Sequence, residues 1–216
     1  AKDMDMALSM IEKEIDAGVE TIILTPHFRK EMFEPDMEDI WSAYDTLVDE
    51  TRNRNIRLYL GCEFHANMEM VETLDRDLRP TLADSRYVLT EFSSSSTRAF
   101  IKERADALLT AGYYPIIAHI ERYRALRKDF DFIADLIEMR CEMQVNADAV
   151  IGRNGLGAQR FCKKLMQEDM LHYVASDAHN LRGRASHMEE CCEYLKKHMG
   201  RLYTSRIMRD NPSKIV

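Results

Sequence analysis

The chain has 216 residues, of which 45% are hydrophobic, and it carries a formal net charge of −7 at pH 7. The acidic balance argues against a dedicated nucleic-acid-binding protein, which usually carries a basic excess, and no apolar run approaches the length of a membrane span. The five cysteines show neither CxxC motifs nor regular spacing, so we expect reduced, mostly buried thiols rather than a disulfide framework.

Short apolar segments alternate with longer amphipathic segments along the chain. The apolar runs are continuous and rich in β-branched residues, which is typical of strands buried on both faces. The expected strands are residues 20–25, 56–61, 86–91, 114–119, 141–146 and 172–176. The expected helices are residues 3–17, 36–53, 97–111, 127–140, 155–169 and 184–199. This succession predicts an α/β fold with a parallel sheet in a single domain spanning 1–216. A dinucleotide-binding fold lacks its glycine-rich fingerprint here.

A potential ligand residue follows or closes every expected strand. These residues are His27, Glu63, Glu91, His119, Asn146 and Asp177, with His179 two positions further on. Successive positions lie 27 to 36 residues apart, which is about one strand–helix unit. In a closed parallel barrel they would share one rim, whereas in an open sheet only those near a switch point would meet. Polar residues often mark strand ends, but a set without Lys, Ser or Gly favours a shared site.

The residue types at this rim favour metal chemistry. Imidazole and carboxylate ligands suit Mn, Fe or Zn, and several converging carboxylates would repel one another without cations. A metal cluster can activate water and bind phosphate oxygens. Arg122 and Arg184 are candidates for planar, two-pronged phosphate contacts. Arg29 and Lys30 form a basic pair that either attracts a phosphorylated substrate or belongs to a solvated loop.

A cysteine-dependent tyrosine phosphatase is excluded by the sequence. Such an enzyme needs an arginine six positions after its nucleophilic cysteine. None of the five cysteines has one; the residues at that position are Met68, Ala147, Glu168, Lys197 and His198.

Six motifs in order give the chain a family resemblance. They are "TPHF", "GCEFH", "LTEF", "AHIERY", "QVNADAVIG" and "ASDAHNLRGR". Together they resemble the PHP superfamily of metal-dependent phosphoesterases, and within it the bacterial tyrosine phosphatases of capsule and exopolysaccharide operons (CpsB/CapC/YwqE type). The resemblance covers essentially the whole chain. It implies a distorted, TIM-like (β/α)7 PHP barrel.

The resemblance also assigns roles to the rim residues. It implies three metal ions in the complete protein, commonly manganese, with iron or zinc also compatible. His27 and His179 match ligands of one ion, and Glu63 matches a carboxylate that bridges two ions. Glu91 and His119 match ligands of another ion, and Asp177 matches a ligand of a further one. Arg122 and Arg184 match the catalytic arginines that hold the phosphate. Arg29 is a further substrate-binding candidate because of its position just past His27.

One departure concerns the start of the chain. The family begins with a "DxHxH" strand and an acidic turn that supply three ligands, whereas this sequence opens at "AKDMDM". We therefore expect one PHP domain over 1–216 whose first, metal-binding strand is not in the sequence. Whether a chain without that segment is active is left open.

The resemblance implies a cytoplasmic, manganese-dependent protein-tyrosine phosphatase. Its substrate would be the phosphorylated, tyrosine-rich tail of a bacterial tyrosine kinase that controls capsular or exopolysaccharide synthesis, attacked by a metal-activated hydroxide. Two alternatives stay open: a PHP phosphoesterase acting on a small-molecule phosphate, and an inactive regulatory binder. We expect neither nucleic-acid binding nor membrane insertion, and a homo-oligomer is compatible with the sequence.

Overall fold

The strands of the computed structural model, which describes residues 1–216, all pair in parallel. They are β1 (Thr21–Leu24), β2 (His27–Phe28), β3 (Arg57–Leu60), β4 (Glu63–His65), β5 (Tyr87–Glu91), β6 (Tyr114–Ile117), β7 (Glu142–Asn146) and β8 (Tyr173–Ala175). One sheet has the order β2-β4-β5-β6-β7-β8, and β1 pairs with β3 separately. The predicted parallel α/β fold is therefore confirmed.

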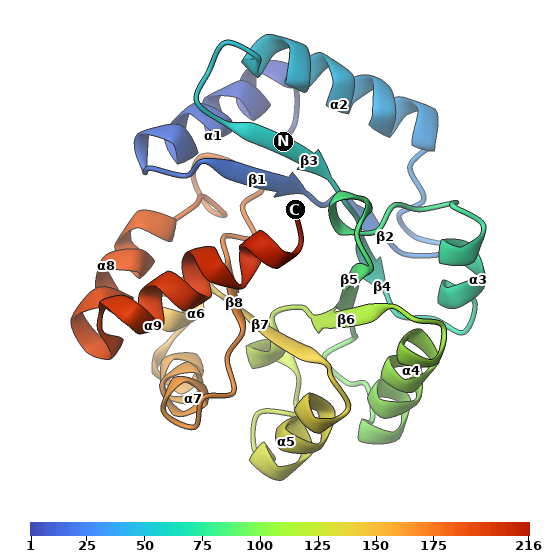
Figure 1. Ribbon diagram of the computed structural model, residues 1–216, viewed down its shortest axis with the longest axis vertical. Coiled ribbons are helices and arrows are strands. Elements are labelled where there is room, and N and C mark those ends of the chain that lie inside the picture. Colours follow the sequence, from blue (N-terminus) through green and yellow to red (C-terminus); the bar gives the residue numbers. More distant parts are fainter.

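Helices surround the curled layer of strands in a ring (Figure 1). The α-helices are α1 (Met4–Asp16), α2 (Met37–Thr51), α3 (Met70–Asp75), α4 (Arg98–Thr110), α5 (Phe130–Glu138), α6 (Ala147–Val150), α7 (Leu156–Gln167), α8 (Met188–Met199) and α9 (Arg201–Ser205). The 3-10 helices are η1 (Leu82–Asp84), η2 (Ile120–Arg122) and η4 (Pro212–Lys214), and η3 (Arg206–Asp210) is a short π-helix. None of the helices combines the length and apolar character needed to cross a bilayer. Because β1 and β8 are not paired with each other, the seven-stranded barrel count stays a prediction.

The two predicted strands nearest the N-terminus each continue as a second, very short strand that the sequence did not reveal. Pro26 separates β1 from β2, and Gly61 separates β3 from β4. A Cβ at Gly61 would lie 2.7 Å from the Leu82 Cδ2 atom, so the close packing of η1 favours glycine there. His27 and Glu63 consequently begin strands rather than follow them, and they are direct neighbours in the β2–β4 register.

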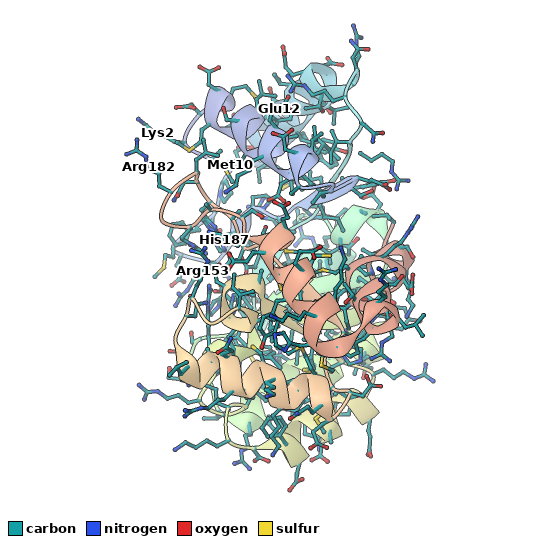
Figure 2. The ribbon with its side chains drawn as sticks, turned by 90° about the vertical axis from the view of Figure 1, so that its left-hand side faces the viewer. Lys2, Met10, Glu12, Arg153, Arg182 and His187 are labelled. Atoms are coloured by element: carbon teal, nitrogen blue, oxygen red, sulfur yellow. The ribbon has the colours of Figure 1, made fainter.

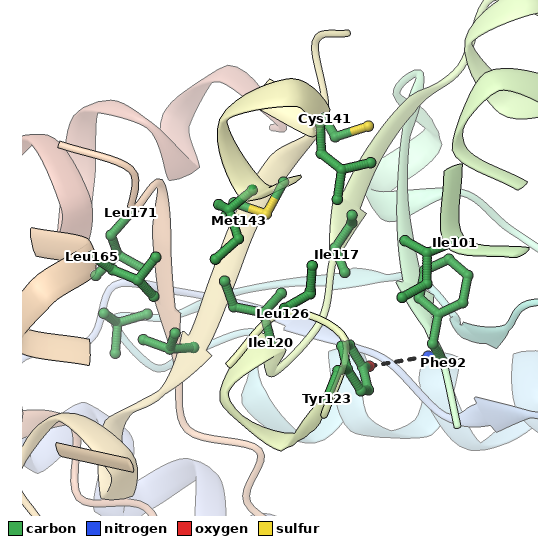
Figure 3. Close-up of a cluster of buried hydrophobic side chains, with 14 of the residues drawn as sticks. Phe92, Ile101, Ile117, Ile120, Tyr123, Leu126, Cys141, Met143, Leu165 and Leu171 are labelled. Carbon is green, nitrogen blue, oxygen red and sulfur yellow. Dashed lines mark hydrogen bonds between the residues drawn. The ribbon is translucent and has the colours of Figure 1, made fainter. Parts of the chain in front are cut away.

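The apolar core lies on both sides of the strands. Inside the curl is a cluster formed by Leu82, Leu89, Ile116, Ala118, Tyr173 and Ile215. The larger cluster lies between the strands and the helices, where Ile117, Met143 and Leu165 are fully buried (Figure 3). Each such side chain contributes roughly 1.5–3 kcal/mol through burial, so this layer holds the strand ends in fixed positions.

Two predicted helices begin three or four residues later than their sequence pattern indicated. The helix expected from residue 127 starts at Phe130 because the Asp129 side chain accepts the Phe132 N–H at 3.0 Å and caps it. The helix expected from residue 184 starts at Met188. Before it, Asn180 Oδ1 accepts the backbone N–H groups of Arg182 and Arg184 at 2.9 and 3.1 Å and folds that segment into a loop.

The five cysteines are all free, and four of them are buried. Burial raises the pKa of the Cys62, Cys141 and Cys191 thiols to about 12, and it also raises the pKa of Cys162. The expectation of reduced, mostly buried thiols agrees with this arrangement.

This burial predicts selective alkylation. N-ethylmaleimide added to the native protein should modify Cys192, which is partly exposed, and leave the four buried thiols unreacted until denaturation. Mass spectrometry of peptides from native and denatured samples measures the pattern. Rapid native labelling of Cys62 or Cys162 would contradict the packing described above.

Candidate functional site

The residues predicted as metal ligands lie together at one end of the strands. His27 and Glu63 begin β2 and β4, and Glu91 ends β5. His119 follows β6, while Asp177 and His179 follow β8. The spacing argument from the sequence therefore gave the correct arrangement, although the individual ligand roles stay predictions.

Glu63 lies at the centre of this rim between two imidazoles. Its Oε2 atom is 2.9 Å from His27 Nδ1, and its Oε1 atom is 2.9 Å from His119 Nε2. Burial alone would raise the pKa of the Glu63 carboxyl, but the hydrogen bonds from His119 and His27 outweigh it and hold the pKa well below its ordinary value. Burial would lower the pKa of His119, yet the hydrogen bonds to Glu63 and Glu91 raise it to about 9.

His27 also faces His179, with 3.0 Å between their Nε2 atoms. The hydrogen bond to Glu63 raises the pKa of His27, whereas burial lowers the pKa of His179. The Nδ1 atom of His179 lies 2.9 Å from the Asp177 carbonyl oxygen, to which it donates when His179 is neutral. This contact leaves the Nε2 lone pair of His179 directed into the site.

The donor set fits a divalent metal ion. One ligand atom each from His27, Glu63 and Glu91 can be chosen so that all lie within 4.8 Å of one another. The Nε2 atoms of His27 and His179, 3.0 Å apart, could also serve as ligands of one ion. His119 Nε2 is 3.4 Å from Glu91 Oε1. Nitrogen and carboxylate ligands of this kind suit Mn, Fe or Zn.

Two arginines and one amide converge on Asp177. Arg122 Nη2 donates to Asp177 Oδ2 at 2.6 Å, and Arg184 Nη2 donates to Oδ1 at 2.8 Å. Asn146 Nδ2 adds a bond to Oδ2 at 2.8 Å, while its own Oδ1 is buried without a partner. The Asp177 side chain is 10% exposed, but those of Arg122 and Arg184 are 41% and 44% exposed. Two guanidiniums are thus exposed to solvent, and both are held by the largely buried carboxylate of Asp177.

Two left-handed backbone conformations position these groups. His119 has φ 34° and Asp177 has φ 50°, a region that non-glycine residues seldom adopt. Strained residues of this kind are enriched at functional sites. In both cases the left-handed residue follows a strand, and its conformation directs the side chain to the rim.

Two further arginines lie outside this cluster: Arg29, which the sequence predicted as a substrate contact, and Arg182, which is close to Arg184 in the sequence. Arg29 follows β2, and its backbone N–H and C=O bond to Phe33 to close a turn, while its side chain is not hydrogen-bonded to the rim residues. Arg182 belongs to the loop between β8 and α8 and projects outward from it (Figure 2). Arg29 therefore stays a predicted substrate contact, and Arg182 offers a charge control in the same loop.

The hydroxyl of Tyr123 contacts the imidazole of His119, a contact that the sequence did not reveal. The same hydroxyl accepts the Phe92 N–H at 3.0 Å (Figure 3) and lies 3.1 Å from His119 Nδ1. Tyr123 is buried, so this contact fixes the imidazole orientation and keeps Nε2 turned towards the carboxylates. The only hint in the sequence is that Tyr123 follows His119 by four residues, about one helical turn.

We expect Tyr123→Phe to weaken metal binding while leaving the fold intact. The phenyl ring keeps the packing, but His119 loses the partner of its Nδ1 atom, and such outer contacts typically contribute about 10–100-fold to metal affinity. Titration with Mn²⁺ under a competing chelator measures the change. Tyr44→Phe, which removes a hydroxyl bonded to the Leu58 carbonyl away from the rim, is the matched control. Equal affinities for the wild type and Tyr123→Phe would contradict this role.

The comparisons with known proteins agree with this geometry. A family model described as capsular polysaccharide synthesis, CpsB/CapC, matches residues 1–216. The chain belongs to the CpsB/CapC family. The family resemblance predicted from six sequence motifs is thus confirmed.

Named relatives of the CpsB/CapC family are tyrosine-protein phosphatases. The tyrosine-protein phosphatase CpsB of Streptococcus pneumoniae is 33% identical over 223 residues, covering 100% of this chain and 91% of the relative. The tyrosine-protein phosphatase YwqE of Bacillus subtilis is 28% identical over 202 residues, covering 93% of this chain and 80% of the relative. A solved structure from work on YwqE and CpsB, described as unique metal-dependent tyrosine phosphatases, superposes with a TM-score of 0.90 at 26% identity, covering 98% of this chain and 87% of the other.

Proposed function

We propose that this chain is a metal-dependent protein-tyrosine phosphatase. The carrying observation is the juxtaposition of a His/Glu cluster with two exposed guanidiniums on one rim. Carboxylates and imidazoles of this kind hold divalent metals, and paired guanidiniums bind phosphate oxygens. The names of the CpsB/CapC relatives support phosphotyrosine as the substrate class.

We assign metal binding to the six rim residues predicted from the sequence, with manganese as the preferred ion and up to three ions in the complete protein. These residues are His27, Glu63, Glu91, His119, Asp177 and His179. When bound, divalent ions supply an activated water and charge stabilisation for phosphoryl transfer. The chain's own contribution is to bring these ligands together on one rim and to orient them.

Arg122 and Arg184 are proposed to bind the phosphate and to stabilise the charge that develops on it. Asp177 holds both guanidiniums in place before substrate arrives. A phosphate that reaches the rim offers them additional acceptors, and planar guanidiniums match its oxygens in two-pronged contacts. Charge stabilisation by fixed donors of this type is commonly a large part of catalysis.

The physiological substrate is proposed to be the phosphorylated, tyrosine-rich tail of a bacterial tyrosine kinase in capsule or exopolysaccharide synthesis. The description of the family as one of capsular polysaccharide synthesis supports this assignment. We also propose a cytoplasmic location, because free cysteines are typical of a reducing compartment. Arg29 is kept as a candidate contact for such a tail.

Hydrolysis of a phosphotyrosine peptide in the presence of Mn²⁺ tests the proposal. We expect phosphate release from this peptide, loss of release with EDTA and recovery when Mn²⁺ is restored in excess. A phosphoserine peptide of the same sequence and a panel of small aliphatic phosphates serve as comparison substrates. Preference for an aliphatic phosphate, or no turnover of any substrate with metal loaded, would reject the assignment.

A further inference from the structure

Three large apolar side chains are exposed to solvent, and they lie within a few residues of His27 or Glu63 in the sequence. Met32, Phe33 and Met68 are 59%, 56% and 66% exposed. Met32 and Phe33 follow β2, which carries His27, and Met68 follows β4, which carries Glu63. An apolar side chain that is exposed to water does not contribute the stabilisation that burial would give. Exposed apolar side chains near a site therefore suggest that they contact a ligand.

Phe33 is held in place by a closed turn. The Arg29 N–H donates to the Phe33 carbonyl at 2.9 Å, and the Phe33 N–H donates to the Arg29 carbonyl at 2.8 Å. The Met32 N–H also donates to the Arg29 carbonyl, at 3.0 Å, and Glu31 takes a left-handed φ of 64° to complete the turn. The position of the Phe33 backbone is therefore fixed by hydrogen bonds.

This turn brings the Phe33 ring beside a predicted metal ligand. Its centroid lies 6.3 Å from that of the His27 imidazole, with 36° between the ring planes. The turn is also tied to the segment after β4, because Lys30 forms an ion pair with Glu69, the residue after Met68. The Lys30–Glu69 ion pair thus joins the loop that carries Met32 and Phe33 to the loop that carries Met68.

A continuous chain of contacts leads from Phe33 to the arginine pair. His27 contacts His179, whose Nδ1 atom lies 2.9 Å from the Asp177 carbonyl oxygen. The Asp177 carboxylate in turn holds Arg122 and Arg184. A phosphate bound by the guanidiniums therefore lies on the same rim as the Phe33 ring.

We propose that Phe33, with Met32 next to it in the chain and Met68 on the linked loop, forms the surface against which the aromatic ring of a phosphotyrosine packs. This inference rests on the proposed function and names the feature that selects its substrate. A phosphotyrosine carries a rigid ring next to its phosphate, whereas phosphoserine carries only a methylene there. Two aromatic rings attract each other in tilted or offset contact, and methionine sulfur packs favourably against ring edges. The surface should therefore bind phosphotyrosine more tightly than phosphoserine.

Phe33→Ala tests the surface because Phe33 is exposed and its loss should not unfold the chain. With Mn²⁺ loaded, we expect the KM for a phosphotyrosine peptide to rise about 3- to 10-fold, the range of one aromatic contact. The kcat should stay within about twofold, because interactions made equally in the ground and transition states affect KM alone. The inhibition constant of inorganic phosphate, which has no ring, should be unchanged.

Two further variants complete the experiment. Phe33→Tyr should keep the wild-type KM, because it keeps the ring, and Trp41→Ala, which removes another exposed aromatic on α2, should have no effect. An unchanged KM in Phe33→Ala, or a parallel rise in the phosphate inhibition constant, would overturn the ring surface while leaving the proposed function standing. A wild-type protein that does not hydrolyse the peptide would overturn both.

Discussion

Glu63→Gln is expected to lower phosphotyrosine hydrolysis by about 10³-fold or more, because the metal ions of such a site contribute several kcal/mol to the reaction. Glu63 is the one carboxylate that contacts two predicted imidazole ligands, with 2.9 Å to each. Gln is nearly isosteric, but it lacks the negative charge that two neighbouring cations would require. Metal content by mass spectrometry and turnover with added Mn²⁺ measure the two effects separately.

The same substitution should change how the stability of the metal-free protein depends on pH. Glu63 has a lowered pKa, so its contribution is present above the ordinary glutamate value of about 4.3. His119 has a raised pKa, so its contribution is full below about 6.5 and is lost as the pH rises through about 9. Urea unfolding in the presence of chelator should therefore show that the stability of the wild type falls as the pH rises from about 6.5 to about 9. Glu63→Gln should flatten that fall.

Two control variants separate charge from fold. Glu63→Asp keeps the charge with a shorter reach, so its loss of activity should be smaller than that of Glu63→Gln. Glu72→Gln changes an exposed carboxylate that pairs with Arg76 on α3 and should behave as wild type. Full metal content and activity in Glu63→Gln would show that Glu63 is only a structural acid.

The sequence predicted the fold well where its signals are local. The strand runs were continuous and β-branched, and all six expected strands are present with ends shifted by no more than two residues. β2 and β4 were missed because strands of two or three residues have no measurable periodicity. They are defined by their partners in the sheet, as the pairing of His27 with Glu63 shows.

The rim could be predicted because each strand–helix unit repeats at a similar length, which places the residues at strand ends in the same phase. The contacts within the rim could not. That Tyr123 lies under His119, or that Asn146 shares Asp177 with Arg122, depends on side-chain directions that spacing does not encode. The metal-ligand and catalytic roles come from family resemblance and chemistry, and they stay predictions until substitutions are measured.

Arg122→Lys and Arg184→Lys should each reduce kcat/KM for a phosphotyrosine peptide by about 10²-fold or more, the usual effect of removing one fixed donor to developing charge. Lysine keeps the positive charge, and with it the neutralisation of Asp177. What it loses is the planar fork, which can hold Asp177 and a phosphate oxygen at once. The effect should therefore appear mainly in kcat, since charge develops on the phosphate only in the transition state.

The double variant distinguishes a clamp from two independent contacts. Both guanidiniums are positioned by the two oxygens of one carboxylate, Asp177, so losing either disturbs the support of the other. The loss in Arg122→Lys/Arg184→Lys should then be smaller than the product of the single losses, as expected for residues that act as a unit. Arg182→Ala, which removes an outward-pointing charge from the same loop, should retain wild-type kinetics. Strictly multiplicative losses would show two independent contacts, and a loss in Arg182→Ala equal to that in Arg184→Lys would show that Arg184 has no special role in the loop.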